Sequence, residues 1–374
     1  MKPLEGLTVV SLEQAVSAPF CTARLADAGA TVIKIERPEG DFARGYDGAA
    51  KGQSSYFVWL NRGKKSVVLD LRRPEERLAL RRLIGGADVF VQNLKPGALD
   101  RMGLSIASLR EQFPMVVFCS ISGYGEQGPL ARRKAYDLLV QAESGLASLT
   151  GTADSMSRVG FSVVDIATGA TAHAAILEAL LRRGRTGEGD AIDIAMFDVI
   201  AEWLTVPLLL HEAGTPPRRI GLAHPSIAPY GAFRTRNGPD VLIAVQNDRE
   251  WAEFARDVLL QPGAASDPRF ATNTLRVANR GETDGLVGAV FASTERPALI
   301  ARLEKAEIAF ADINDMAALS RHPHLHRISV ELAEGDQRLP APAARFASHA
   351  RDYGPVPALG SHSRQIRAQL GLED

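Results

Sequence analysis

The sequence predicts an α/β fold, with a large domain built on a mostly parallel sheet and a smaller α+β domain beside it. Two observations support this prediction. From residue 7 to residue 118, short β-branched runs alternate with helical segments, a pattern typical of parallel strands covered on both faces. The chain has 374 residues, 45% of them hydrophobic, so it can bury a full core and exceeds one average domain.

The strands of the large domain follow from these apolar runs, and glycines mark the helix ends between them. Gly29 and the pair Gly85-Gly86 stand directly before strands, where a helix C-cap is needed. A helix is expected over residues 22–28. The expected strands are Leu7–Leu12, Thr31–Ile35, Ser66–Leu71, Val89–Val91 and Met115–Phe118.

A long helix is expected from Asp165 to Arg183, because apolar residues recur there at helical spacing. A strand over residues 191–197 then leads into a helix that runs to about His211. The breaker at residues 214–217, Gly-Thr-Pro-Pro, marks a domain boundary. We therefore expect a large Rossmann-like domain over residues 1–212, linkers and a small domain over 213–324, and a Pro-rich tail, 325–374, that returns to the large domain.

Charge and cysteine content narrow the class of protein. Forty-three basic and 44 acidic residues give a net charge of −1, which argues against a general nucleic-acid binder. Glu5 and Glu13 interrupt the apolar N-terminal stretch, so neither a signal peptide nor a membrane span is expected, and the protein is expected to be cytoplasmic. Cys21 and Cys119 lack metal-ligand spacing, so we expect two buried apolar residues and no metal site.

The common nucleotide and hydrolase motifs are missing. The first strand is followed by the glycine-free run from Glu13 to Pro19, so this turn lacks the GxGxxG pattern with which dinucleotide-binding proteins hold a pyrophosphate. No phosphate loop, HExxH helix or GxSxG elbow occurs. Interpretations as a nicotinamide-dependent, phosphate-loop, zincin or serine-hydrolase enzyme therefore lose their main support.

Cations follow several strands or begin helices. They include Arg37, in the run Lys34 to Pro38, together with Lys64, Lys65, Lys95, Arg101 and Lys134. Ligands of open α/β sheets bind at the carboxyl ends of strands, so converging cations there would hold a polyanion such as the phosphates of a nucleotide-like carrier. Solvated strand ends also carry Lys and Arg, and periodicity alone does not separate these readings.

Asp165 stands at a predicted helix start beside the small residues Ala167 and Gly169. One interpretation is a helix N-cap. The other is a nucleophilic carboxylate that helix N-terminal amides keep ionised and that small neighbours leave accessible.

With these residues in place, the sequence resembles family III CoA-transferases, the CaiB/BaiF group. The resemblance runs in order over nearly the first 240 residues and is looser in the C-terminal third. It rests on Leu12 to Ala28, Val32 to Pro38, Asn61 to Leu71, Gln92 to Gly97, Asp100 to Gly103, Ser122 to Gly125, Tyr136-Asp137, Val164-Asp165 and Arg185 to Gly189.

The resemblance implies a catalytic role for Asp165, which would attack an acyl-CoA thioester and carry CoA as an aspartyl thioester. CoA is then a substrate, and neither a tightly bound cofactor nor a metal is required. An interlocked homodimer is implied as well. The stretches that match the family's CoA contacts carry Gln14, Ala15, Arg37, Lys64, Lys65, Asn93, Lys95, Arg101 and Lys134.

Two other functions remain as alternatives at this point. Related α-methylacyl-CoA racemases move a proton with a His and Asp pair, but here Tyr136 precedes Asp137 where the racemase histidine would stand. An unperturbed Tyr, with a pKa of about 10, is a poor base near neutral pH, which favours the transferase. Tyr136 and Asp137 are then expected either to line the acyl pocket or, for Tyr136, simply to pack. A CoA-binding scaffold without chemistry is the second alternative.

The loop from Gly221 to Gly231 lies where formyl-CoA transferases carry a mobile glycine tract, which this chain lacks. A Pro-bounded loop with His224 and Ser226 should be stiffer, and it offers donors to a substrate carboxylate. It resembles the loop of members that act on dicarboxylates, pairing succinyl-CoA with mesaconate, itaconate, citramalate or malate, intramolecular transfer on mesaconyl-CoA included. Arg218 and Arg219 are expected either to bind a distal carboxylate or to be solvated.

Overall fold

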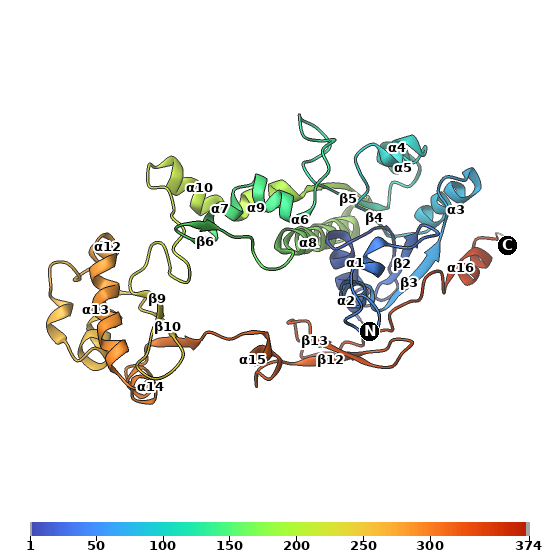
Figure 1. The fold of residues 1–374 in the computed structure, drawn as a ribbon. Coiled ribbons are helices and arrows are strands. Elements are labelled where there is room, and N and C mark those ends of the chain that lie inside the picture. The colour runs from blue at the N-terminus through green and yellow to red at the C-terminus, as the bar shows by residue number, and fades with distance from the viewer. Residues whose placement is uncertain (1, 372–374) are drawn as a thin grey trace. The chain divides into compact units, whose positions relative to one another are not determined.

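The computed structural model describes residues 2–371, and its core is a six-stranded parallel sheet (Figure 1). Its strand order is β3-β2-β1-β4-β5-β8, and each neighbouring pair is parallel. The predicted α/β class with a mostly parallel sheet is thereby confirmed. The strands are β1 (Thr8–Leu12), β2 (Thr31–Glu36), β3 (Lys64–Val68), β4 (Val89–Gln92), β5 (Val117–Ser122) and β8 (Ala191–Ala195).

Helices cover both faces of this sheet. One face packs Val9, Val32 and Val117 against the long helices α1 and α8, and the other packs Ile33, Phe90 and Phe118 against α3 and α5. The buried, free Cys21 and Cys119 belong to the first of these cores, as predicted. The helices around the sheet are α1 (Ser17–Asp27), η1 (Phe42–Gly45), α2 (Ser55–Asn61), α3 (Pro74–Gly85), α4 (Ala98–Arg101), α5 (Ile106–Gln112), α6 (Asp137–Glu143), α8 (Val163–Thr186), α9 (Met196–Trp203) and α16 (Ser363–Gln369).

The strand order reverses between β1 and β4. β1 is followed along the chain by β2 on one side, and β4 pairs with its other side. A crevice at the carboxyl ends of the strands is expected at such a switch point. Gln14 and Asn93 follow these two strands directly, so the fold places them at this crevice.

Helices α1 and α8 pack closely because Gly169 lies at their crossing. A Cβ at this position would come within 2.4 Å of the Ser17 carbonyl oxygen, so a side chain would force the helices apart. Within residues 2–371, α8 is the one helix long and apolar enough to cross a membrane. Its contacts with α1 and β5 show a core helix of this domain instead.

Element boundaries differ from the predicted ones at several starts. α1 begins at Ser17, five residues before the predicted start, since Pro19 fits the first turn of a helix. β3 begins at Lys64 rather than Ser66. α8 begins at Val163 with Ser162 at its N-cap position, so Asp165 is the third helical residue and the N-cap interpretation is wrong.

The chain divides into two compact units. The first contains residues up to 147, residues 158–206 and residues from 326 onward, and the second contains 148–157 and 207–325. The sequence analysis did not separate residues 148–157 from the large domain.

The second unit has its own sheet and core. Three antiparallel strands in the order β11-β10-β9 pack beside Trp251, Phe254 and Phe291. The elements here are β6 (Gly151–Thr152), β7 (Ser155–Met156), β9 (Tyr230–Phe233), β10 (Val241–Ala244), α11 (Asp248–Glu253), η2 (Phe254–Val258), η3 (Pro262–Ala265), α12 (Asn273–Ala278), α13 (Arg280–Ser293), α14 (Arg296–Lys305), β11 (Ala309–Asp312) and α15 (Met316–Ser320). The short helices α7 (Leu146–Leu149) and α10 (Thr205–Glu212) lie across the boundaries between the units.

The tail returns to the first unit and lies along the sheet edge. After the hairpin of β12 (Arg327–Val330) and β13 (Gln337–Pro340), the chain runs beside β3. Gly63 donates its N–H to the Pro355 carbonyl at 2.8 Å, and Ser66 accepts from the His362 N–H at 3.0 Å. The Val68 N–H donates to the Ser363 hydroxyl at 2.9 Å. The tail therefore pairs the Ser66 carbonyl and the Val68 N–H on the outer side of β3.

Candidate active site

A cavity of about 640 Å³ opens at the carboxyl ends of β1, β4 and β5. Its lining comes from the loop after β1, the segment after β4, and the first turns of α6 and α8. Eight residues singled out from the sequence share this lining: Gln14, Ala15, Asn93, Lys95, Lys134, Tyr136, Asp137 and Asp165.

Asp165 lies in the wall of the cavity, in the first turn of α8. Burial raises the pKa of its carboxyl to about 7, the nearby Asp137 carboxylate adds to the rise, and a hydrogen bond with Ser17 opposes it. The expectation that helix amides keep this carboxylate ionised is wrong. The amides of the first turn already have other partners, as described next. The pKa of the Asp165 carboxyl therefore lies near 7 instead of in the ordinary carboxylate range.

Asp137 caps α8 from a neighbouring helix. Its Oδ1 accepts the Val164 N–H at 2.8 Å and the Asp165 N–H at 3.2 Å, two donors that have no partner within the helix. Its Oδ2 accepts a hydrogen bond from Gln141 Nε2 at 2.6 Å. The sequence analysis missed Gln141, although its position four residues after Asp137 on a helix is a usable signal.

Two tyrosines that the sequence analysis did not single out form an aromatic wall of the cavity. Tyr46 and Tyr56 pack edge to face with ring centroids 5.4 Å apart. Burial raises the pKa of Tyr46 to about 12, and the charges of Asp41 and Asp165 and the nearby Tyr136 add to this. Tyr136 is 58% exposed. Tyr46 lies in an irregular segment whose sequence carries no periodic signal.

The loop after β1 is held rigidly at the cavity. The Asn93 carboxamide donates to the Gln14 carbonyl and accepts the Gln14 N–H, both at 2.9 Å. Ala15 has a φ of +63°, a left-handed conformation that costs free energy for a residue with a Cβ, and its N–H donates to Asp41 at 3.2 Å. Asn93 therefore orders this loop through the same amide atoms that were expected to contact CoA.

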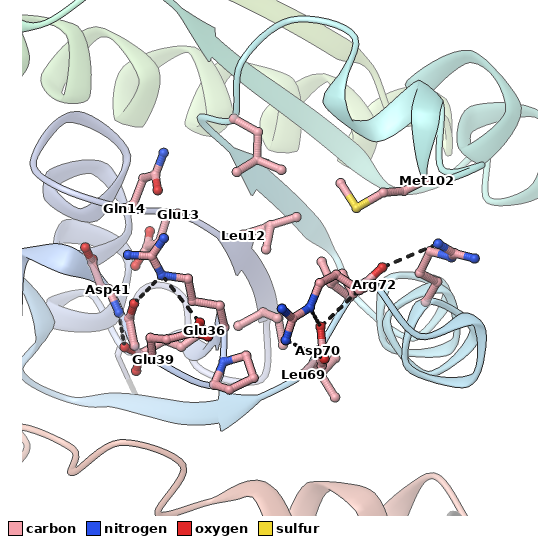
Figure 2. A pocket seen from close by; sticks show the side chains of 17 residues that line it. Leu12, Glu13, Gln14, Glu36, Glu39, Asp41, Leu69, Asp70, Arg72 and Met102 are labelled. Atoms are coloured by element: carbon pink, nitrogen blue, oxygen red, sulfur yellow. Dashed lines mark hydrogen bonds and ion pairs between the residues drawn. The ribbon is translucent and has the colours of Figure 1, made fainter.

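A second cavity, of about 490 Å³, adjoins the first and shares Gln14 and Leu94 with it. Figure 2 shows Leu12, Leu69 and Met102 among its apolar lining, with Asp70 paired to Arg72 at 2.7 Å. Arg37 also lines it. This guanidinium uses Nε on the Gly40 carbonyl at 2.8 Å and is 56% exposed.

A third hollow, of about 860 Å³, adjoins the first cavity on another side and shares Lys95 and Pro96 with it. Arg101 and Arg132 line this hollow, together with Glu126. Exposed cations thus extend from the cavity of Asp165 into both neighbours, which is an arrangement that suits a long polyanionic ligand.

Comparison with known proteins identifies the family. The family described as CoA-transferase family III matches residues 4–363. The chain belongs to this family.

Named relatives of this CoA-transferase act on dicarboxylates. It is 35% identical to a succinate–glutarate CoA-transferase of Agrobacterium fabrum, over 98% of this chain and 96% of the relative. It is 31% identical to a succinyl-CoA:mesaconate CoA-transferase of Haloarcula hispanica, over 100% of this chain and 97% of the relative. A crystal structure of a CaiB/BaiF family protein from Brucella suis, 35% identical, covers 99% of both chains with a TM-score of 0.83.

The structure argues against a CoA contact for Lys64 in this transferase. Its side chain is fully buried, and Nζ contacts Glu13 Oε1 at 2.7 Å, the Pro19 carbonyl at 3.1 Å and Asn61 Oδ1 at 3.2 Å. An ammonium has three donors, and all three are used. Both Lys64 and Lys65 belong to the amino end of β3, and neither lines any of the three cavities described above.

His224 and Ser226 belong to the second unit, on a loop that is clamped by side chains. The Ser226 N–H donates to His224 Nδ1 at 3.1 Å, and the imidazole stacks on Tyr230 with ring centroids 5.3 Å apart. Because Nδ1 accepts, the neutral ring carries its proton on Nε2. Arg280 donates to the carbonyls of His224 and Ile227, so the predicted stiffness has a structural cause.

The two loop arginines differ. Arg219 donates to three backbone carbonyls, those of Ser148, Thr152 and Ala153, at 2.9 to 3.1 Å, so it ties the hairpin of β6 and β7 to the loop. Arg218 lines a cavity of about 600 Å³ together with Ser226.

Among residues 2–371, no group of three or more His, Cys, Asp or Glu side chains could hold a metal ion.

Proposed function

We propose that this CoA-transferase moves CoA between dicarboxylic acids through an aspartyl-CoA thioester on Asp165. The observation that carries the proposal is the half-buried Asp165 carboxyl in the wall of a cavity whose other walls bear exposed cations. A carboxylate is a suitable nucleophile here, because the anhydride it forms is about as activated as a thioester.

The proposed steps keep an acyl group activated at every stage from the donor thioester to the new one. An Asp165 oxygen attacks the donor thioester carbon and the C–S bond breaks. CoA departs as its thiolate, and an acyl-aspartyl anhydride is formed. The thiolate attacks the Asp165 carbonyl carbon, which releases the donor acid as a carboxylate and leaves the aspartyl-CoA thioester. The acceptor carboxylate reverses both steps and regenerates the Asp165 carboxylate. The negative charge passes from group to group, so no proton, metal or water enters the balance.

The raised pKa of Asp165 fits this nucleophilic role. A carboxylate with a pKa of about 7 is more basic than an ordinary one, and therefore more nucleophilic once ionised. The same burial disfavours the ionised resting form, so only about half of the population is ready to react near pH 7.

The CoA moiety is proposed to follow the adjoining cavities. Arg37, Lys95, Arg101 and Lys134 supply cations for its phosphates, and Gln14, Ala15 and Asn93 form the ordered cavity wall along which the rest of the CoA chain would lie. Lys64 and Lys65 are not included.

The dicarboxylate class is supported by the relatives. The relatives named above act on glutarate or mesaconate with succinate or succinyl-CoA. Mesaconate, itaconate, citramalate, malate and glutarate are therefore the acceptors to test, and transfer between the two carboxylates of mesaconyl-CoA is included.

A homodimer, interlocked as in the family, is part of the proposal. Leu181 and Trp203 in the first unit are 69% and 59% exposed in the single chain, a large apolar exposure for one chain alone. A second copy that covers them would remove this exposure from water.

Incubation with succinyl-CoA and each acid should give new CoA esters, measured by mass spectrometry. Hydroxylamine or borohydride should trap an intermediate whose modified peptide contains Asp165, and Asp165→Ala should form neither product. Full turnover in that variant would disprove the mechanism.

The same experiment separates the alternatives. A racemase would exchange the α-hydrogen of an acyl-CoA with deuterium from heavy water and form no new ester. A scaffold would bind CoA without ever labelling Asp165.

A further inference from the structure

Gln141 on α6 is a fully buried amide next to the reacting centre that the proposed steps do not use. Its Nε2 donates to Asp137 Oδ2 at 2.6 Å, and its Oε1 accepts the Val159 N–H at 2.9 Å. A backbone N–H can only donate and an ionised carboxylate can only accept. The carboxamide therefore has one possible orientation, with its nitrogen toward Asp137 and its oxygen toward Val159.

The amide stands at the start of a chain of contacts that ends at the nucleophile. Gln141 holds one oxygen of Asp137, and the other oxygen accepts the N–H groups of Val164 and Asp165. The residue whose backbone is held in this way is the one whose side chain lines the cavity.

This arrangement needs a support because two carboxylates face each other. Asp137 is buried, and its charge disfavours ionisation of Asp165. Across residues 2–371, neither carboxylate has a Lys, Arg or His partner within ion-pair distance. Hydrogen bonds to Asp137 from Gln141 and from the helix amides are therefore what compensates its burial.

We propose that Gln141 is a positioning residue of the transfer reaction: its carboxamide holds Asp137 against the first turn of α8 and thereby fixes Asp165 for attack on the thioester. This inference rests on the function proposed above and assigns a role to a residue that does not touch the substrate.

The charged surroundings of Asp165 give the inference a measurable sign. Asp137 faces it from α6, Tyr46 and Tyr136 are the nearby phenols, and Lys95, Arg133, Lys134 and Arg158 line the same cavity. Loss of the Gln141 donor releases one oxygen of Asp137, so this carboxylate is no longer held at its present distance from Asp165. A like charge that lies further away opposes ionisation of Asp165 less, and the pKa of Asp165 falls.

The test uses Gln141→Met, which keeps the length of the side chain and removes its hydrogen bonds to Asp137, to the Phe161 carbonyl and from the Val159 N–H. We expect kcat to fall about tenfold to a hundredfold from misplacement of the nucleophile. The KM for acyl-CoA should stay within about twofold of the wild-type value, because no CoA contact changes. The acid limb of the pH profile of kcat/KM should move to lower pH.

Gln141→Glu tests the hydrogen-bond donor alone, because it keeps the size of the side chain and removes the amide N–H. It keeps an oxygen for the Val159 N–H but sets a carboxylate against Asp137, so kcat should fall at least as far as in Gln141→Met. Thr168→Val is the matched control: it removes a buried hydrogen bond from the same turn of α8, to the Val164 carbonyl at 2.7 Å, without touching either carboxylate. The control should keep the wild-type pH profile.

The coupling to Asp137 is tested in an Asp137→Asn background. If Gln141 acts through Asp137, Gln141→Met should move the acid limb in the wild type but not in that background. Equal shifts in both backgrounds, or an unchanged kcat and profile in folded Gln141→Met, would overturn the inference. Failure to trap a thioester on Asp165 in the wild type would instead overturn the proposed function, so the two failures are distinguishable.

Discussion

Two groups of buried carboxylates lie near the carboxyl edge of the same sheet. They differ in whether lysine side chains balance their charge. Glu13 and Asp41 are matched by lysines: Lys64 contacts Glu13 at 2.7 Å, and Lys34 contacts Asp41 at 2.8 Å. Burial raises the pKa of Glu13, but the charges of Lys64 and Lys34 outweigh it, and the net shift is downward. Within the part of the chain that the structure describes, Asp137 and Asp165 have no such cation, and the pKa of Asp165 rises to about 7.

The paired carboxylates have a structural role, and the carboxylates without a cation are available for the reaction. Four buried charges that cancel in pairs can order a loop, because none of them is left to react. A carboxyl left beside another carboxylate costs stability in its ionised form and keeps its oxygens for a substrate. The predictions below are ordered from the largest expected effect to the smallest.

Replacement of the unpaired carboxylate should give the largest change. Asp165→Asn should lower the transfer rate at least about a thousandfold, because the nucleophile itself is lost. The same variant should be more stable than the wild type at pH 8, measured by thermal unfolding.

The sign of that stability gain follows from the pKa of Asp165. The folded value of about 7 exceeds the ordinary 3.8, so the folded wild type holds a proton that the unfolded chain loses between pH 4 and 7. Wild-type stability therefore declines across this window, and the advantage of Asp165→Asn should grow from pH 5 to pH 8. An advantage that shrinks with pH would contradict the assignment.

Removal of one charge from the paired cluster should do the reverse. Glu13→Gln leaves Lys34 and Lys64 facing Asp41 alone in the interior, and we expect a loss of about 3–5 kcal/mol in the free energy of unfolding, measured in urea. The double variant Glu13→Gln with Lys64→Met restores neutrality and should recover part of this loss. If Glu13→Gln is as stable as the wild type, the cluster is not structural.

The pH dependence of kcat/KM in the wild type should reflect the pKa of Asp165 beside Asp137. The value of kcat/KM should rise with pH through an inflection near 7, because Asp165 must lose its proton to attack. Asp137→Asn removes the like charge and should move this inflection to lower pH. An inflection that stays in place would assign the raised pKa to burial alone.

The smallest effects are expected at exposed cations. Arg37→Ala should raise the KM for acyl-CoA about tenfold at low salt, less at high ionic strength, and leave the melting temperature unchanged. Arg73→Ala is the control, because Arg73 pairs with Glu75 at the surface and lines none of the three cavities. Equal effects of the two variants would argue against a phosphate site at Arg37.

Local sequence patterns were sufficient for the sheet and for the family. The alternation of strands and helices predicted a parallel α/β fold, and ordered motifs around Asp165 predicted membership of CoA-transferase family III; both are confirmed. Gln14 and Asn93, which follow β1 and β4 directly, meet at one edge of the sheet; the family resemblance, not the strand pattern, had singled them out.

The local patterns failed where tertiary contacts decide. Lys64 reads like any cation near a strand, and only packing shows that Glu13, Pro19 and Asn61 use all its donors. The environment of Asp165 depends on Asp137, which lies 28 residues away in the chain. Tyr46 was missed for the same reason, since Asp41, Tyr136 and Asp165 come from other segments. Gln141 is different, because its partner Asp137 lies four residues before it on the same helix.

The pairing of the tail along β3 also bears on how the chain is made. The Gly360 N–H donates to the Ser66 hydroxyl at 2.9 Å, and these two residues are 294 residues apart in the sequence. A ribosome that has finished β3 must synthesise all of the second unit before the covering segment emerges, and until then the outer strand presents unpaired N–H and C=O groups. Nascent chains of this transferase are therefore expected to need protection by a chaperone against edge-to-edge association throughout most of translation.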